Sequence, residues 1–259
     1  MWLDWRISRW QVYSVLIGES VANSTDKSKG LKMRKTIIKN DVHFLQVIGT
    51  KIVINDNYDG ILVLDCNLNL LKKIKVFDGV CIYSSFITGE NEMVLFCPED
   101  DKIAYINIER EKVYIMDIPE GIKNEIISRM ILNNTSRAIF KTNKGKYVAL
   151  DKENKRLEMI EYGASAEMEK KQIWDGATDI LKNYSDCNHR DVKDHSFVAI
   201  YEEKIIIYNN QQSREIFPEE GYIFNNAKIM DSYRGRHLVV LSNKKADNSV
   251  SALLIMNMK

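Results

Sequence analysis

The most informative feature of the sequence is a short apolar run that ends in Asp or Asn and recurs five times. The copies are Ile61–Asp65, Ile103–Asn107, Tyr147–Asp151, Ile205–Asn209 and Leu253–Asn257. They recur at spacings of about 42 to 58 residues, and β-rich units with such periods are typical of propeller blades rather than helical arrays. Because the runs are apolar at nearly every position, they predict strands that are buried on both faces.

Further strands flank each run. The predicted strand before each run, across a polar turn, is Lys51–Asp56, Glu92–Cys97, Arg137–Thr142, Ser196–Tyr201 or His237–Ser242. The predicted strand after each of the first four runs is Leu70–Val76, Lys112–Ile118, Arg156–Tyr162 or Ser213–Phe217. A further strand upstream is predicted at His43–Ile48, Ile82–Thr88 and Ile126–Leu132. Lysine on the strands that follow the runs is typical of an outer edge that faces water.

The two ends of the chain are expected to share one sheet. The fifth run has no strand after it, and Gly30–Lys39 resembles the outer strand Asn69–Val76. We therefore predict an all-β chain whose single domain, residues 1–259, is a β-propeller of five four-stranded blades. The N-terminal segment would close the ring by joining the C-terminal blade, with Trp10–Gly18 as an extra strand or cap. Six blades and a β-sandwich are the alternatives.

The repeat resembles the generic β-propeller pattern, in the broad sense shared by WD-repeat proteins, over roughly residues 30–259. It lacks the Gly-His to Trp-Asp pair of WD repeats, the Ser-x-Asp-x-Gly-x-Thr-Trp turn of sialidases and the double glycine of kelch repeats. The resemblance implies a fold and no activity, since propellers host enzymes, lectins and scaffolds alike.

Two polar patterns predict turns rather than sites. Asp or Asn ends every copy of the run, and we expect this residue to form the following turn, because an active site would break the repeat. The segment Asn55–Gly60 resembles the start of a calcium loop. Its twelfth position should be a glutamate that binds through two oxygens, and Cys66 stands there. We therefore predict a hairpin turn.

The composition and the net charge disfavour some classes of function. Hydrophobic residues make up 45% and charged residues 28% of the chain, and the net charge is +1. These values are those of a globular protein with no overall field for nucleic acid or an acidic membrane. The four cysteines contain no CxxC pair, which fits a reducing compartment. No segment approaches the roughly 20 apolar residues of a membrane span, and we expect a cytoplasmic protein without membrane contact.

The longest spacing, between the third and fourth runs, predicts an insertion at about residues 163–195. It holds apolar residues at partly helical spacing and the polar cluster His189–His195. Two imidazoles and two carboxylates could bind zinc or act as acid and base, but a charged loop beside a strand is usually solvated. We predict no catalytic residue, metal or cofactor. The candidate partner-binding residues are Trp174, His189, Asp191, Asp194 and His195.

No catalytic or cofactor motif points to an enzyme: Gly-x-Ser-x-Gly, the P-loop and GxGxxG are all absent. We therefore predict a non-enzymatic intracellular protein-binding module. Usage rich in Lys, Ile and Asn suggests an AT-rich bacterial genome, where an immunity protein that neutralises a toxin fits this description. The alternatives are a five-bladed lectin or glycosidase and, more weakly, an RNA or tRNA binder that uses Lys32, Arg34 and Lys35.

Overall fold

The architecture is known from a computed structural model that describes residues 22–26, 31–76, 79, 81–161, 187, 189–194, 196–209 and 212–258. Within these ranges the chain is all-β, with two short 3-10 helices, η1 (Pro98–Asp100) and η2 (Glu120–Ile122). The strands form five antiparallel sheets, four of four strands and one of five. Over the same ranges no helix has the length and apolar character needed to cross a membrane.

We number the sheets as blades in chain order. Blade 1 consists of β3 (Leu45–Ile48), β4 (Lys51–Asp56), β5 (Gly60–Leu64) and β6 (Leu70–Lys75). Blade 2 consists of β7 (Ser84–Gly89), β8 (Glu92–Cys97), β9 (Lys102–Asn107) and β10 (Lys112–Asp117). Blade 3 consists of β11 (Ile127–Asn133), β12 (Arg137–Thr142), β13 (Tyr147–Asp151) and β14 (Arg156–Ile160). Blade 4 consists of β15 (His189–Lys193), β16 (Ser196–Ile200), β17 (Ile205–Asn209) and β18 (Gln212–Ile216).

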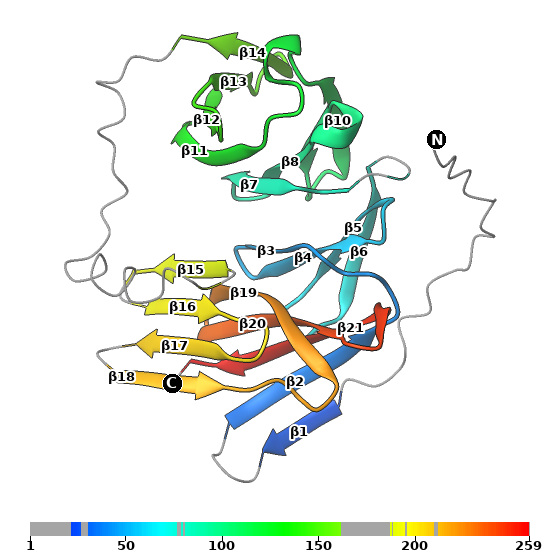
Figure 1. Ribbon diagram of the computed structural model, residues 1–259, viewed down its shortest axis with the longest axis vertical. Coiled ribbons are helices and arrows are strands. Elements are labelled where there is room, and N and C mark those ends of the chain that lie inside the picture. Colours follow the sequence, from blue (N-terminus) through cyan, green and yellow to red (C-terminus); the bar gives the residue numbers. More distant parts are fainter. Residues whose placement is uncertain are drawn as a thin grey trace, which may run out of the picture.

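Blade 5 is built from both ends of the described chain. Its order is β19 (Tyr222–Ser232), β20 (Gly235–Lys244), β21 (Asp247–Asn257), β2 (Leu31–Ile38) and β1 (Ala22–Asp26). Strand β2 pairs antiparallel with β21, with Met33 opposite Met256 and Lys35 opposite Leu254. This confirms that the N-terminal segment joins the C-terminal blade (Figure 1).

The sequence pattern predicted the blades closely. The five sheets and the strands Lys51–Asp56, Glu92–Cys97 and Arg137–Thr142 are confirmed as predicted. Three strands were not predicted, namely β1, β15 and β19, and β1 makes blade 5 five-stranded. The loop expected at His189–Lys193 is wrong, because these residues form β15. The predicted strand Trp10–Gly18 and residues 163–186 of the predicted helical or loop insertion lie outside the described residues.

The blades pack face to face. Four hydrophobic clusters join blade 4 to blade 5, blade 5 to blade 1, blade 1 to blade 2 and blade 2 to blade 3. In Figure 1 these blades form a curved row, and blades 3 and 4 lie at its two ends. No cluster of described residues spans blades 3 and 4, and residues 162–186, which link them in sequence, are outside the description.

Burial follows position within a blade. Every residue of β5 is buried, since this strand is covered on both faces, whereas most residues of the outer strand β6 are exposed. The turn between β4 and β5 needs a glycine: a Cβ on Gly60 would stand 2.2 Å from the carbonyl oxygen of Ile74. The segment Asn55–Gly60 is thus a hairpin connection, as predicted.

The recurring Asp or Asn forms the following turn in three of the blades. Asp65 Oδ1 accepts the backbone N–H groups of Asn67 and Asn69, at 2.7 and 2.9 Å. The equivalent Asp151 accepts two backbone N–H groups in the same way, and these hydrogen bonds lower its pKa, that from Asn154 foremost. Asn107 accepts one, from Arg110. The predicted turn-forming role is confirmed at these positions.

Candidate functional site

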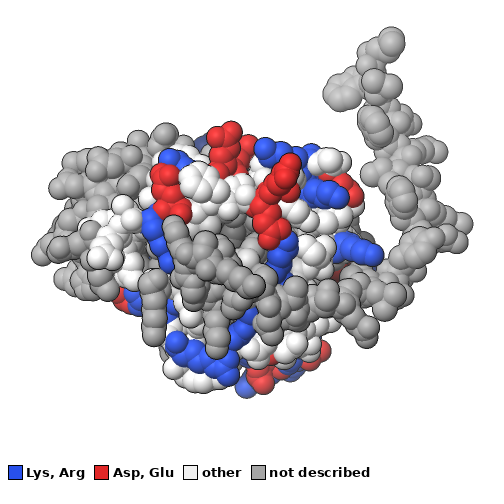
Figure 2. Space-filling view, turned by 90° about the horizontal axis from the view of Figure 1, so that it is seen from below, with Lys and Arg blue, Asp and Glu red and all other residues white. Residues whose placement is uncertain are grey.

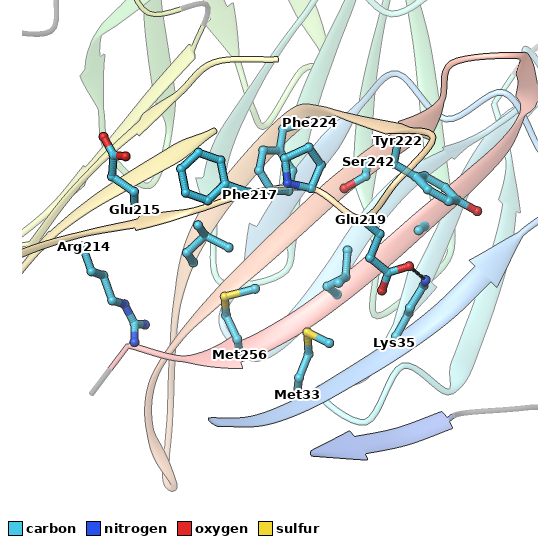
Figure 3. A pocket seen from close by; sticks show the side chains of 14 residues that line it. Met33, Lys35, Arg214, Glu215, Phe217, Glu219, Tyr222, Phe224, Ser242 and Met256 are labelled. Carbon is cyan, nitrogen blue, oxygen red and sulfur yellow. Dashed lines mark hydrogen bonds and ion pairs between the residues drawn. The ribbon is translucent and has the colours of Figure 1, made fainter. Parts of the chain in front are cut away.

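A groove lies between the outer strand of blade 4 and one face of blade 5. It encloses about 360 Å³. The residues that line it are Met33, Lys35, Arg214, Glu215, Ile216, Phe217, Pro218, Glu219, Tyr222, Phe224, Ser242, Ala252, Leu254 and Met256 (Figure 3). Most of these side chains are apolar, and the charged ones lie toward the two ends, which is typical of a site that takes apolar groups and orients them with a few polar contacts.

The alternation of side chains along β2 and β21 builds the floor of the groove. Met33 on β2 and Leu254 and Met256 on β21 point to the same face of blade 5, toward blade 4. Leu253 and Ile255, one position away on β21, point to the opposite face and pack against blade 1. Since successive residues of a strand face opposite sides, one apolar run supplies both an inter-blade core and a groove floor.

Blades 4 and 5 differ in width. Blade 4 ends at β18, whereas blade 5 continues past β21 through β2 and β1. The cluster that joins the two blades includes Leu254 and Met256, and Ile216 and Met33 pack against it at its rim. The face of blade 5 beyond Ile216 therefore has no strand of blade 4 over it in the described part of the chain.

Charged side chains lie at the two ends of the groove. Near one end, the Arg214 guanidinium donates from Nη2 to the carbonyl oxygen of Asn257 at 2.8 Å, and burial lowers the pKa of Arg214. At the other end the ammonium of Lys35 pairs with the carboxylate of Glu219 and lies 5.3 Å from the ring centroid of Tyr222. A cation over an aromatic ring is attracted by the electrons of the ring face.

Phe217 is the most exposed apolar side chain of the groove. It follows β18 directly and is 66% exposed. A phenylalanine leaves a large apolar surface in water at this exposure, and burying it would be favourable by roughly 25 cal/mol for each Å² covered. An exposed aromatic beside an apolar groove is typical of a binding surface. The strand prediction Ser213–Phe217 gave no sign of this exposure, which depends on how blades 4 and 5 pack.

The candidate residues from the sequence lie elsewhere, at the inner side of blade 4. Asp191 on β15 accepts the backbone N–H of Ile229 on β19 at 2.7 Å. Asp194 lies 2.5 Å from the Arg236 guanidinium, which also contacts Asp231 at 2.8 Å. These carboxylates therefore tie blade 4 to blade 5.

The structure says less about the other three candidate partner-binding residues. His189 lies on β15, and Trp174 and His195 lie outside the described residues. Partner binding at these five positions stays a prediction. In the described part of the chain, no three His, Cys, Asp or Glu side chains are placed to hold one metal ion.

A second polar cluster consists of His43 on the connection between β2 and β3, Asn55 on β4 and Cys81 on the connection between blades 1 and 2. His43 Nε2 is 3.9 Å from Cys81 Sγ, and the side-chain nitrogen of Asn55 is 3.2 Å from His43 Nδ1. Burial lowers the pKa of His43. Burial, with the nearby Glu99 carboxylate, raises the pKa of Cys81. Since a thiol must ionise to attack a substrate, this environment disfavours a nucleophilic Cys81.

Two of the basic residues that the sequence suggested for RNA binding form contacts within the protein. Figure 2 shows one face of the molecule, on which basic and acidic side chains stand among neutral ones without a large area of one sign. Of the basic residues considered for RNA, Arg34 donates to the carbonyl oxygen of Cys66 and Lys35 pairs with Glu219. Both cations are thus engaged within the protein.

Comparison with known proteins gives structural likeness only. No protein-family model matches the chain, and no curated protein does. Among solved structures, YCF48 bound to D1 peptide has 9% sequence identity and a TM-score of 0.40, covering 90% of this chain and 73% of that one. The N-terminal domain of Nup159 has 9% identity and a TM-score of 0.36, with coverages of 84% and 76%.

A third similar structure belongs to a much longer chain. The extracellular domain of the putative one-component system BT4673 from B. thetaiotaomicron has 10% identity and a TM-score of 0.36. The match covers 82% of this chain, which spans only 27% of that chain.

Proposed function

We propose that the protein is a non-enzymatic protein-binding module that holds an apolar segment of its partner in the groove between β18 and blade 5. The observation that carries this proposal is Phe217, 66% exposed at the edge of an apolar groove of about 360 Å³. Aromatic residues next to a pocket supply much of the binding energy of protein interfaces.

The chemistry of the groove favours a peptide over a sugar. The floor carries Met33, Leu254 and Met256, and methionine side chains adapt well to the apolar groups of a partner. A sugar ring needs several hydrogen-bonding groups, whereas the polar groups of this groove lie toward its ends. The lectin and glycosidase alternatives are therefore less favoured here. The four cysteines are free thiols, which supports a reducing compartment and our proposal of a cytoplasmic protein.

Site-specific photo-cross-linking tests the proposed function. One form of the full chain carries benzoylphenylalanine at position 217 and a matched form carries it at position 233, and both are irradiated in lysate of the source organism. Tyr233 is the control because it is 83% exposed in the turn between β19 and β20, away from the groove. We expect one protein to cross-link at position 217 and not at position 233.

The cross-linked protein is then purified and rebound to variants. Phe217→Ala should weaken binding about tenfold or more, as loss of a central aromatic anchor does, whereas Tyr233→Ala should leave it unchanged. Equal effects of the two substitutions, or cross-linking at neither position, would contradict the proposal. If the partner is an enzyme that this protein inhibits, the toxin-immunity hypothesis is supported; a partner without such activity removes it.

A further inference from the structure

The outer edge of β18 borders the groove. In the described part of the chain, β18 pairs only with β17. Asn209 pairs with Gln212, and two residues connect them. In such a hairpin the pair next to the turn exchanges both backbone hydrogen bonds, and bonded and non-bonded pairs then alternate. The N–H and C=O groups of Ser213 and Glu215 therefore point away from β17.

The side chains of β18 differ in their exposure and in their relation to the groove. Arg214 and Ile216 line the groove and are partly buried. Ser213 and Glu215 are exposed. Glu215 also lies at one end of the groove lining, and its carboxylate pairs with Lys204 at 2.8 Å. Among the described residues, the outer edge of this strand pairs with no other strand, and an apolar groove lies beside it. These are the two elements of strand addition, where a peptide extends a sheet.

We propose that the partner binds as an extended strand that pairs with the edge of β18 and becomes the fifth strand of blade 4. Neighbouring strands lie about 4.8 Å apart. A strand added at this distance would lie beside Ile216, over the face of blade 5 that carries Met33 and Met256. It would continue the packing that already joins blades 4 and 5. This inference rests on the proposed function of the groove.

The residues that line the groove also predict which side chains the partner strand carries. Side chains of a strand alternate between its faces, so every second residue would enter the groove. Those residues should be apolar where they meet Met33, Leu254 and Met256. One of them should be acidic, because the guanidinium of Arg214 lines the groove and its positive charge attracts a carboxylate. The partner is therefore an extended segment of alternating apolar residues with one acidic residue.

Peptide selection followed by backbone variants tests this inference. A phage-displayed library of random peptides is selected on the full chain and, in parallel, on the Met33→Lys variant. We expect enriched peptides on the unmodified chain alone, with apolar residues at alternate positions and one acidic residue among them. The enriched peptide is then synthesised with a fluorescent label, and its Kd is measured by fluorescence anisotropy.

Glu215→Pro and Glu215→Ala form the decisive pair. Both lose the carboxylate, but only proline removes the outward N–H, and proline is tolerated on an edge strand. We expect Glu215→Pro to weaken peptide binding about tenfold more than Glu215→Ala does, because the two variants share the loss of the carboxylate from the groove lining. Equal melting temperatures of the two variants serve as the folding control. As a second measurement, methylating alternate backbone nitrogens of the peptide should abolish binding in one register and not in the other.

The outcomes separate the inference from the proposed function. If Phe217→Ala and Met33→Lys weaken binding but Glu215→Pro and the methylated peptides do not, the groove binds its partner without strand addition, and the inference is wrong. If none of these changes matters, or no peptide is enriched, both proposals are wrong. Binding only to a chain without residues 1–21 would show that the chain itself occupies the groove, which would also overturn the inference.

Discussion

Single buried polar residues join neighbouring blades. Lys152 is 5% exposed, and its ammonium donates to the carbonyl oxygens of Thr88 and Asn134 and to Asn133 Oδ1, at 2.6 to 2.7 Å. Thr88 belongs to blade 2 and the other residues to blade 3 or its turns, so one cation ties the two blades together. Burial lowers the pKa of Lys152. A buried charge is tolerated when hydrogen bonds replace its water.

The lowered pKa of His43 predicts that the stability of the protein depends on pH. Burial is the largest influence on its pKa and lowers it from 6.5, although the nearby Asp41 carboxylate acts in the opposite direction; the ring also contacts Asn55, Tyr58 and Cys81. The unfolded chain therefore binds a proton more readily than the folded one. This contribution to the free energy of unfolding is complete above pH 6.5 and is lost as the pH falls through the folded pKa.

The measurement is urea denaturation of the protein and of His43→Gln between about pH 8 and pH 5. We expect the stability of the unmodified protein to fall faster below pH 6.5 than that of the variant. His237→Gln is a parallel variant, since burial also lowers the pKa of His237. A constant difference between the unmodified protein and His43→Gln over this range would contradict the account.

At the residue scale, the sequence predicted repeated roles better than unique ones. The turn-forming Asp65 and Asp151 were predictable because an equivalent position recurs in each blade. The cluster around Asp191 and Asp194 occurs once, and its charges suggested a loop. Its carboxylates instead contact Ile229 and Arg236 of blade 5. Pairing partners about 40 residues away cannot be recognised from local polarity.

Among the strands, position within a blade decides how much each contributes to stability. The central strand β21 is buried from Ser251 to Met256, with one face against blade 1 and the other toward blade 4. The outer strand β6 has mostly exposed side chains, including Leu71, which is 49% exposed. Local sequence distinguishes these strands well, because continuous apolar runs mark the first type and lysine-rich alternation marks the second.

Leucine-to-alanine substitutions on the two strand types should therefore differ widely. Leu253→Ala removes a side chain that is 0% exposed in the cluster between blades 5 and 1. We expect a loss of about 2–5 kcal/mol in the free energy of unfolding, measured by urea denaturation. Leu71→Ala should cost less than about 0.5 kcal/mol. Similar losses for the two variants would show that the strands are not layered as described.

Two of the strands that the sequence missed, β15 and β19, lack a local pattern that marks a strand. β19 (Tyr222–Ser232) mixes buried and partly buried residues along its length, with a bulge between Phe224 and Asn226. Such a strand shows neither a continuous run nor regular alternation. β15 is short and highly charged, and it is a strand because β16 and blade 5 supply its partners.

For the whole molecule, the sequence predicted the blade number and the joining of the two ends, but not the groove. The repeat fixes how many blades there are, and the resemblance between two outer strands indicated that β2 completes blade 5. The groove is lined by residues of β18 and the segment after it and by residues of β19, β20, β21 and β2. Since these residues come from distant parts of the sequence and meet only in the fold, no local pattern indicated the groove.

The central claim is that the groove at β18 is the surface that binds the partner. Hydrogen–deuterium exchange of the full chain, with and without the partner identified by cross-linking at position 217, tests it most directly. We predict slower exchange in peptides that contain Gln212–Ile216, and unchanged exchange in Arg156–Ile160, the equivalent outer strand of blade 3. Unchanged exchange in Gln212–Ile216, with protection elsewhere, would contradict the claim.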